Sequence, residues 1–366
     1  MKVALVHDYL VQGMRGAERC LAAFHDIWPE APIYTLAHDP EAMGEACREW
    51  DVRPSFLQKI PGAIKHLPKL LPLMPRAIES LPLGEYDLIV SDSSAWPKSV
   101  IFREDAIYVC YCHSPARFLW HWSDEYLETA SGSRFAKSIA RRLLPRLRAW
   151  DLRTCGRPTH YLANSRTAQG RIKKYWDIDS QVIEAPVDTQ RLLPEDHDED
   201  HFLAVAALNP YKRVDLAIEA FNELGLPLVV VGDGPMREDL AALAGPNIRM
   251  AGKVSDEELQ HLYGRCRALV MPQLEDFGIA PVEAMSTGRP VIAYGAGGAL
   301  ETVIDGETGV FFDEQTPAAL IDATRRFEGM SFDKARCRER ALEFDTEIFK
   351  TRIRDFVEQA TSGARE

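Results

Sequence analysis

Residues 268–288, ALVMPQLEDFGIAPVEAMSTG, contain the pattern that decides the fold class of this protein. The apolar run 268–271 predicts a buried strand, and the residues after Gly278 predict a helix that stops near Gly288. Pro281 favours the first turn of that helix, because a missing N–H costs nothing there. A strand, a glycine-containing loop and a helix in this order form the repeating unit of an α/β domain.

The same unit recurs along the chain. Further apolar runs predict strands at 3–6, 88–90, 107–109, 161–163, 202–206, 228–231, 291–294 and 310–312. The acidic stretch 194–200 separates the two series, and 366 residues are too many for one ordinary core. We therefore predict an α/β protein of two Rossmann-like, doubly wound domains, 1–186 and 187–345, with a ligand cleft between them.

Composition and charge exclude several classes of protein. With 46% hydrophobic and 27% charged residues, the chain is globular and neither disordered nor fibrous. Residues 1–185 hold 24 Lys+Arg against 22 Asp+Glu, whereas the remainder holds 19 against 33. This asymmetry argues against a general nucleic-acid binder, so we expect no nucleic-acid partner. It also makes the first half the better partner for an anionic molecule.

The cysteines and the start of the chain bear on localisation. Seven cysteines form an odd set without C-x-x-C pairs, which indicates reduced, structural thiols. The apolar stretch after Met1 is too short for a signal peptide, and no run approaches the ~18 apolar residues of a membrane span. We expect a cytoplasmic protein.

Two carboxylates flank the start of the helix in the opening segment. Glu275 precedes that helix and Glu283 is predicted in its first turn, while residues 278–280 present backbone N–H groups that favour a phosphate. A carboxylate suits vicinal hydroxyls because it accepts two hydrogen bonds, so one glutamate suits a sugar and the other a ribose. On spacing alone, a dipole-complementing Glu283 and a solvated Glu275 explain the pattern equally well.

Basic residues occur in the segment 209–213, NPYKR, which follows another predicted strand. Its first two residues predict a helix start, which places Lys212 and Arg213 in a first turn where the helix dipole disfavours cations. Their presence indicates a bound anion, and ordinary surface charge is the alternative. The glycine loops 232–234 and 295–298 do not complete G-x-G-x-x-G, which disfavours a dehydrogenase.

As a set, these motifs resemble those of the retaining glycosyltransferases of family 4, which have the GT-B fold. The resemblance is dense over 202–312 and rests on PYKR at 210–213, VVGDGP at 230–235, the E-x7-E element at 275–283 and GAGG at 295–298. It implies transfer of a sugar from a nucleotide diphosphate with retention of configuration. It also implies that cations and helix N-termini, and no metal or further cofactor, hold the leaving diphosphate.

The resemblance assigns roles in the second half of the chain. Lys212 and Arg213 neutralise the diphosphate, and Glu283 holds the ribose. Contacts to the donor sugar come from Glu275, Phe277, Gly278 and Ile279, and contacts to the base come from Lys253 and Val254. Ala207 stands where many members have an arginine, so more of the phosphate charge rests on Lys212 and Arg213. Whether Glu275 is a nucleophile or only orients the sugar stays open.

In the first half, the resemblance assigns two further features. The loop 13–18, GMRGAE, lets its backbone at Gly13 and Gly16 approach the diphosphate, and His113 lies beside the donor sugar as a catalytic residue. Without the resemblance, the loop is a turn before a helix, and a lone histidine is more often structural. The helix predicted at 346–366 crosses back to pack on the first domain.

Two basic stretches of the first half bear on the acceptor. Residues 134–148 contain six basic residues, no acid and interleaved leucines, and residues 60–78 combine lysines with repeated Leu-Pro. Basic amphipathic helices lie on anionic membranes, which predicts a peripheral enzyme on the inner face of the plasma membrane. Its acceptor is then a glycan or a polyprenyl-diphosphate-linked molecule. Two solvated helices packed on the first core are the alternative.

The family members most like this chain are bacterial mannosyltransferases of polysaccharide and O-antigen (lipopolysaccharide) assembly, which favours GDP-mannose as the donor. A UDP-sugar-dependent transferase is one alternative. The others are a nucleotide-sugar epimerase, which shares the fold and the phosphate site but uses no acceptor, and a sugar-nucleotide sensor or membrane-bound scaffold without activity.

Overall fold

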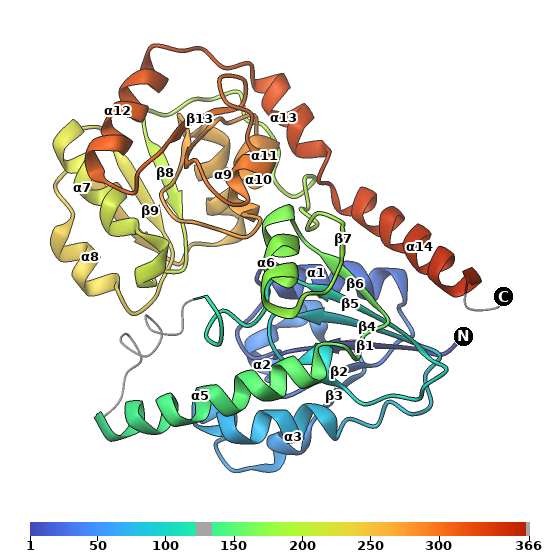
Figure 1. Cartoon of the computed structure of the whole chain (residues 1–366). Coiled ribbons are helices and arrows are strands. Elements are labelled where there is room, and N and C mark those ends of the chain that lie inside the picture. Colours follow the sequence, from blue (N-terminus) through green and yellow to red (C-terminus); the bar gives the residue numbers. More distant parts are fainter. Residues whose placement is uncertain (122–133, 364–366) are drawn as a thin grey trace. The chain divides into compact units, whose positions relative to one another are not determined.

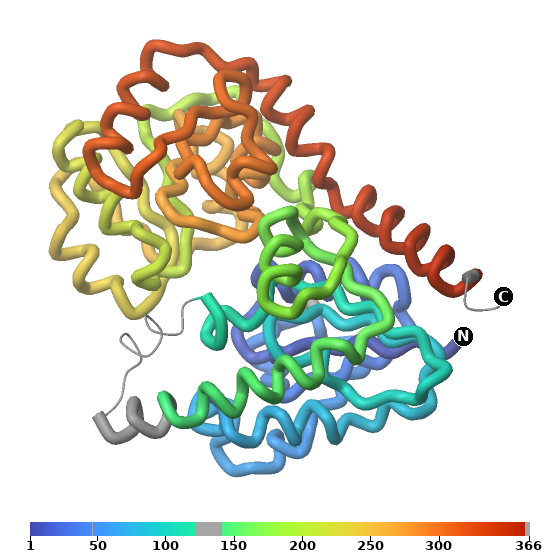
Figure 2. The backbone as a smooth tube through the Cα atoms, in the orientation of Figure 1, coloured from blue at the N-terminus to red at the C-terminus, as the bar shows by residue number. Residues whose placement is uncertain are grey.

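The computed structural model of the chain describes residues 1–121 and 134–363, which form two compact units (Figure 1). Unit 1 comprises Met1–Glu184 and Phe349–Glu366, and unit 2 comprises Ala185–Ile348. Figure 2 traces the backbone, in which the blue first strand and the red C-terminal helix both belong to unit 1. Each unit is built on one all-parallel sheet, so the predicted α/β class is confirmed.

The sheet of unit 1 has seven strands in the order β3-β2-β1-β4-β5-β6-β7. The strands are β1 (Val3–His7), β2 (Ile33–Thr35), β3 (Val52–Pro54), β4 (Leu88–Ser93), β5 (Ile107–Cys112), β6 (His160–Ala163) and β7 (Gln181–Val182). The helices are α1 (Gly16–Ile27), α2 (Pro40–Met43), α3 (Met74–Glu79), α5 (Arg134–Thr154), α6 (Arg166–Trp176) and, from Phe349 onward, α14 (Thr346–Gly363). Short 3-10 helices are η1 (Glu45–Cys47), η2 (Phe56–Lys59), η3 (Ile64–Leu73) and η4 (Pro97–Ser99).

Alternate residues of the unit 1 strands face two layers of helices. Ile89 packs with side chains of α3, α5 and α6, whereas its neighbours Leu88 and Val90 pack with those of α1 and α14. Phe349 of α14 contacts Phe24 of α1, with ring centroids 5.3 Å apart. Because both faces of the sheet are covered, its strands are continuous apolar runs without polar alternation.

The sheet of unit 2 has six strands in the order β10-β9-β8-β11-β12-β13. The strands are β8 (Phe202–Val205), β9 (Leu228–Val231), β10 (Ile248–Gly252), β11 (Leu269–Met271), β12 (Val291–Tyr294) and β13 (Gly309–Phe312). The helices are η5 (Pro210–Lys212), α7 (Val214–Leu224), α8 (Arg237–Leu243), α9 (Asp256–Arg265), α10 (Ile279–Ser286), α11 (Ala299–Thr302), α12 (Pro317–Glu328) and α13 (Lys334–Leu342).

Helices also cover both faces of the unit 2 sheet (Figure 1). Leu228 and Val230 pack with α7, α8 and α12, whereas Val229 and Val231 pack with α9, α10 and α13. Each sheet order reverses direction once, between β1 and β4 in unit 1 and between β8 and β11 in unit 2. In open parallel sheets, ligands bind at the carboxyl ends of the strands that flank such a reversal.

Every strand predicted from an apolar run is present, and the structure adds four short strands that were not predicted. β2, β3, β7 and β10 have two to five residues each, and β10 buries only Gly252. β4 also runs three residues beyond its apolar run, because buried Ser91, Asp92 and Ser93 pair with β5. Among the described residues, no helix is long and apolar enough to cross a lipid bilayer.

Candidate functional site

The switch point of unit 2 brings the basic segment and the first glutamate together. Lys212 lies in the loop after β8 and Glu275 in the loop after β11, and these strands are neighbours in the sheet. Their side chains form an ion pair, and the Lys212 ammonium also lies 5.2 Å from the centre of the Tyr211 ring. A cation and a carboxylate, predicted separately, therefore share one location.

The backbone around Arg213 differs from the prediction. We expected Pro210 to start a continuous helix with Lys212 and Arg213 in its first turn. Instead, η5 ends at Lys212, Arg213 adopts a left-handed conformation with φ of 49°, and α7 begins only at Val214. The helix start at Asn209 and Pro210 is thus confirmed, with Lys212 in η5, but the first-turn placement of Arg213 and the continuous helix were wrong. A non-glycine residue in this region stores about 1 kcal/mol or more of strain, which the fold offsets elsewhere.

Helix α10 begins as predicted but carries Glu283 one turn later than expected. Gly278, with φ of 85°, is the N-cap, and Ile279 is the first helical residue. Glu283 is therefore the fifth residue of α10 and lies in its second turn, so the first-turn prediction was wrong and dipole complementation does not explain this residue. The backbone N–H groups at the start of α10 remain suited to an anion.

Glu283 is held by two residues that the sequence pattern did not single out. One carboxylate oxygen accepts from Arg191 Nη2 at 2.8 Å, and the other accepts from the Tyr263 hydroxyl at 2.9 Å. Burial and the neighbouring carboxylate raise the pKa of Tyr263 well above its ordinary value, so the hydroxyl keeps its proton. No local motif marks these partners, which lie 92 and 20 residues from Glu283 in the sequence.

The glycine loops of unit 2 pack against the backbone of neighbouring loops. A Cβ on Gly232 would lie 1.8 Å from the carbonyl oxygen of Ala206, and one on Gly298 would lie 2.1 Å from that of Phe277. The Gly298 N–H also donates to the Glu275 carbonyl at 2.9 Å. These glycines therefore fix the loops that carry Lys212 and Glu275, a role that the sequence did not reveal.

The remaining predicted residues of unit 2 lie at the same edge of the sheet. Phe277 is buried, and its ring contacts Phe344 at a centroid distance of 5.6 Å, so it offers a ligand its backbone only. Lys253, which is exposed, and Val254, which is half-buried, directly follow β10. β10 is separated from β8 by one strand.

In unit 1, the predicted glycine loop is a tight entry to α1. Gly13 has φ of 78°, and a Cβ there would lie 3.3 Å from the Ala42 carbonyl oxygen. Gly16 is the first residue of α1, and the N–H of Arg15 before it donates to the Glu18 carboxylate at 3.1 Å. The positive φ explains the glycine at position 13 without a ligand.

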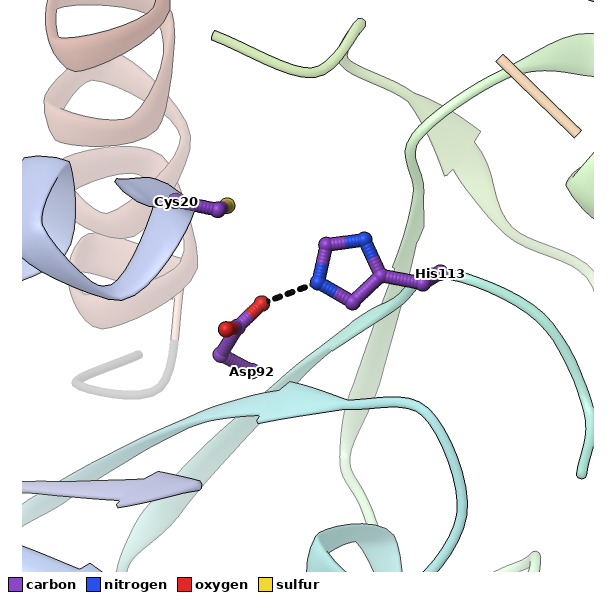
Figure 3. A group of neighbouring side chains, drawn as sticks. All are labelled: Cys20, Asp92 and His113. Carbon is purple, nitrogen blue, oxygen red and sulfur yellow. Dashed lines mark hydrogen bonds and ion pairs between the residues drawn. The ribbon is translucent and has the colours of Figure 1, made fainter. Parts of the chain in front are cut away.

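His113 follows β5 and belongs to a buried hydrogen-bonded cluster (Figure 3). Its Nε2 lies 2.5 Å from Asp92 Oδ1, and Nδ1 of His7 lies 2.9 Å from Asp92 Oδ2. Burial opposes ionisation of Asp92, but at acid pH the charges of the two protonated histidines and their hydrogen bonds outweigh it and lower the pKa of Asp92 to about 2. Asp92 is therefore a carboxylate at every pH at which the protein is expected to work.

The Cys20 thiol completes a group with Asp92 and His113 in which the three ligand atoms lie within 4.8 Å of one another (Figure 3). The chemistry of this group is poor for a metal. Burial and the nearby Asp92 charge raise the pKa of Cys20 well above its ordinary value, whereas metals bind the thiolate. Both oxygens of Asp92 are already engaged by histidines.

Two family models match the chain, and together they span residues 23–344. Glycosyltransferase Family 4 matches residues 23–191, and Glycosyl transferases group 1 matches residues 189–344. A solved structure of Anabaena Alr3699/HepE in complex with UDP and glucose has the same fold, with a TM-score of 0.68 over 98% of this chain and 99% of that chain, at 18% identity. The chain thus has the GT-B fold.

Named relatives match over shorter stretches. D-rhamnosyltransferase WbpZ of Pseudomonas aeruginosa is 33% identical over 34% of this chain and 35% of its own length. O-antigen chain mannosyltransferase C of Escherichia coli is 30% identical over 37% of this chain and 39% of its own length. The matches thus cover little more than a third of these curated relatives. Both family models and both named relatives are glycosyltransferases, so the chain is similar to glycosyltransferases over residues 23–344.

Proposed function

We propose that this protein is a retaining glycosyltransferase that moves a sugar, with mannose favoured, from a nucleotide diphosphate to a glycan or lipid-linked acceptor in bacterial polysaccharide biosynthesis. The observation that carries the proposal is the pairing of Lys212 with Glu275 at the switch point of unit 2, in the loops before α7 and α10. A cation and free helix N–H groups suit a diphosphate, and a carboxylate suits the hydroxyls of a sugar.

The same residues supply the chemistry that the transfer needs. Negative charge grows on the diphosphate as the glycosidic bond to the donor breaks, and groups that stabilise this charge lower the barrier. Lys212 and Arg213 are our candidates for these cations, and the Arg213 side chain, which pairs with Asp215, is 36% exposed. When a diphosphate takes Lys212, the Glu275 carboxylate is released from its ion pair and becomes available to the sugar.

GDP-mannose is the favoured donor because one named relative is an O-antigen chain mannosyltransferase. UDP-sugars are the second candidate, since a protein of the same fold was solved with UDP and glucose. Calorimetric titration with GDP-mannose, GDP, UDP-glucose and UDP separates the two. We expect binding of the guanine nucleotides, and indifference to all four ligands would overturn the proposal. The anomeric configuration of the product, read by NMR, tests retention.

Metal independence is part of the proposal. Asp-x-Asp sequences occur at 177–179 and within 196–200, and most of their carboxylates pair with cations. Lys173 contacts Asp177 and Asp179, and Lys334 contacts Asp198 at 2.7 Å. Full turnover in EDTA is the expected result, and restoration of activity by Mg²⁺ or Mn²⁺ would contradict it.

We propose that the protein attaches to membranes through surface charge alone, without the apolar α5 face that the sequence pattern indicated. Leu144 and Leu147 of α5 are buried in the core of unit 1, so these two leucines offer no apolar face to a bilayer. Arg141, Arg142 and Arg146 are exposed and supply charge alone, while the stretch 60–78 exposes Leu73, Lys65 and Lys69. We expect salt-sensitive flotation with anionic liposomes and none with neutral ones. Flotation that is insensitive to salt would contradict an electrostatic attachment.

The epimerase alternative is less well supported, because both named relatives are transferases. Incubation with donor alone distinguishes the two activities. An epimerase converts the donor without an acceptor, whereas a transferase leaves the sugar configuration unchanged and at most hydrolyses it. A sensor without activity binds the donor but shows no turnover with any acceptor.

A further inference from the structure

The buried cluster around Asp92 joins four separate elements of unit 1. His7 ends β1, Asp92 lies near the end of β4, His113 follows β5 and Asn164 follows β6. These strands lie side by side in the sheet, and Asp92 is 1% exposed. Every link in the cluster is a hydrogen bond whose direction can be worked out from the chemistry of its partners.

One end of the chain of hydrogen bonds starts at a backbone donor. The Ala168 N–H donates to the Ser165 hydroxyl at 3.0 Å, which is the N-cap bond of α6. The Ser165 hydroxyl in turn donates to the Asn164 side-chain oxygen at 3.0 Å. Because that oxygen faces Ser165, the amide NH₂ of Asn164 faces His113, where Nδ2 lies 3.3 Å from Nδ1. Nδ1 must then offer a lone pair.

At the other end of this chain of hydrogen bonds, the charge on Asp92 determines which histidine nitrogens carry protons. An ionised carboxylate only accepts hydrogen bonds, so Nε2 of His113 and Nδ1 of His7 both carry protons. His113 is therefore neutral, with its single ring proton on Nε2. The ring also meets Tyr111 edge-on, with centroids 5.4 Å apart, which limits its rotation.

Of the two histidines that contact Asp92, His7 is the one whose surroundings favour a positive charge. Burial lowers the pKa of His7, but its hydrogen bond to Asp92 and the charges of Asp92, Glu18 and Asp8 outweigh this and raise it. Nε2 of His7 lies 4.0 Å from the Glu18 carboxylate of α1, which also receives the N–H of Arg15. The loop that enters α1 and His113 are thus anchored to one cluster.

We propose that Asp92 is a positioning residue that fixes His113 as the neutral tautomer protonated on Nε2, with His7 as its counter-ion and Asn164 as the partner of Nδ1. A ligand group that displaces the Asn164 amide from Nδ1 must then donate a hydrogen, as a hydroxyl does, while a phosphate or carboxylate oxygen is refused. His113 in this state is no proton donor toward a ligand. The consequence for turnover rests on the proposed function, but the tautomer does not.

The test is two-bond ¹H–¹⁵N NMR of the full-length protein with ¹⁵N-labelled histidine, in which His113→Asn identifies the His113 signals. Between pH 6 and 8 we expect an unprotonated Nδ1 and a protonated Nε2. An imidazolium, or a proton on Nδ1, would overturn the proposal whatever the enzyme transfers. This measurement needs no variant of the cluster to fold other than the one used for assignment.

Two substitutions then separate positioning from simple support of the fold. Asn164→Asp replaces the NH₂ group by an acceptor, so we expect His113 to become doubly protonated at pH 7. Glu18→Gln is the matched control, since it removes a carboxylate that lies near His7 and accepts the Arg15 N–H, and we expect the His113 tautomer to be unchanged. A neutral His113 in Asn164→Asp, or an altered tautomer in Glu18→Gln, would contradict the assigned roles.

Turnover provides the second readout. In Asn164→Asp we expect kcat to fall on the order of 10-fold, while KM for the donor changes less than twofold. If the wild-type protein turns over no donor, the proposed function fails and the tautomer result still stands. If turnover is unchanged while His113 is doubly protonated, the tautomer has no bearing on the reaction and the positioning role is refuted.

Discussion

The polar groups at the two switch points differ in how completely the fold satisfies them. In unit 1, Asp92 is 1% exposed and each of its oxygens accepts a histidine N–H. In unit 2, the Lys212 and Glu275 side chains are 17% and 11% exposed and pair with each other, and the Arg213 side chain is 36% exposed. The charged groups of unit 1 are thus buried and fully paired, whereas those of unit 2 are partly exposed, with Arg213 paired to Asp215.

The largest expected effect comes from removing the cation of unit 2. Lys212→Ala takes away a charge that stabilises the leaving diphosphate, so we expect kcat/KM to fall on the order of 100-fold or more. Steady-state kinetics with the donor measure it. Arg336→Ala is the matched control, because Arg336 pairs with Glu307 on the surface of the same unit, and its kcat/KM should stay within about twofold. Equal losses in both variants would remove the distinction between the two cations.

The second prediction compares how much unfolding free energy each unit loses when its carboxylate, Asp92 or Glu275, is replaced by an amide. Asp92→Asn leaves a buried His7 cation without its partner, and we expect unit 1 to lose about 3 kcal/mol of unfolding free energy. Glu275→Gln breaks a partly exposed pair and should cost unit 2 under about 1 kcal/mol.

The chain itself provides the probe for this comparison. All seven tryptophans lie between Trp28 and Trp176, so tryptophan fluorescence in urea reports on unit 1 alone. Hydrogen exchange of peptides from residues 185–348 reports on unit 2. A larger loss for Glu275→Gln than for Asp92→Asn would reverse the contrast between the units.

The third prediction concerns acid. The folded pKa of Asp92, about 2, lies below its ordinary value of 3.8, so its contribution to stability is present above pH 3.8 and is lost as the pH falls toward 2. The shift corresponds to about 2 kcal/mol. In the wild type we expect the unfolding free energy of unit 1, measured by tryptophan fluorescence, to fall over this pH window. In Asp92→Asn we expect it to depend less on pH over the same window. An unchanged slope in the variant would show that other carboxyls cause it.

The smallest expected effect concerns the partner of Glu283. Tyr263→Phe removes one hydrogen bond to the carboxylate, which should cost about 1 kcal/mol and weaken nucleotide binding several-fold. The ratio of affinities for the ribonucleotide and its 2′-deoxy analogue should shrink if Glu283 contacts the ribose. Tyr294→Phe, in the same unit, serves as the control and should leave that ratio unchanged.

The fold was predictable from apolar runs, and so was part of the site. The central strands can be recognised in the sequence as continuous apolar runs. Both faces of a parallel sheet are covered by helices, so nearly every residue of a central strand is buried. The resemblance named Lys212, Glu275, Glu283 and His113, and the structure joins the first two in one ion pair. Their roles toward a donor stay predictions that the experiments above address.

Other features could not be predicted, for identifiable reasons. The first-turn placements of Arg213 and Glu283 assumed ideal helix starts, but η5 ends in a left-handed residue and α10 begins four residues before Glu283. The leucine pattern of α5 fits a membrane-facing surface and a core-facing surface equally well. Only the packing in the structure shows that Leu144 and Leu147 are buried.

By itself, the sequence determined the alternation of strands and helices and the motifs at the strand ends, because apolar periodicity and glycine or proline positions act over a few residues. Only the tertiary structure decided which side chains meet. His7 and Asp92 are 85 residues apart and come together because β1 and β4 are neighbours in the sheet. Lys212 and Glu275, 63 residues apart, pair because β8 adjoins β11. Strand order is a long-range property, and no local pattern encodes it.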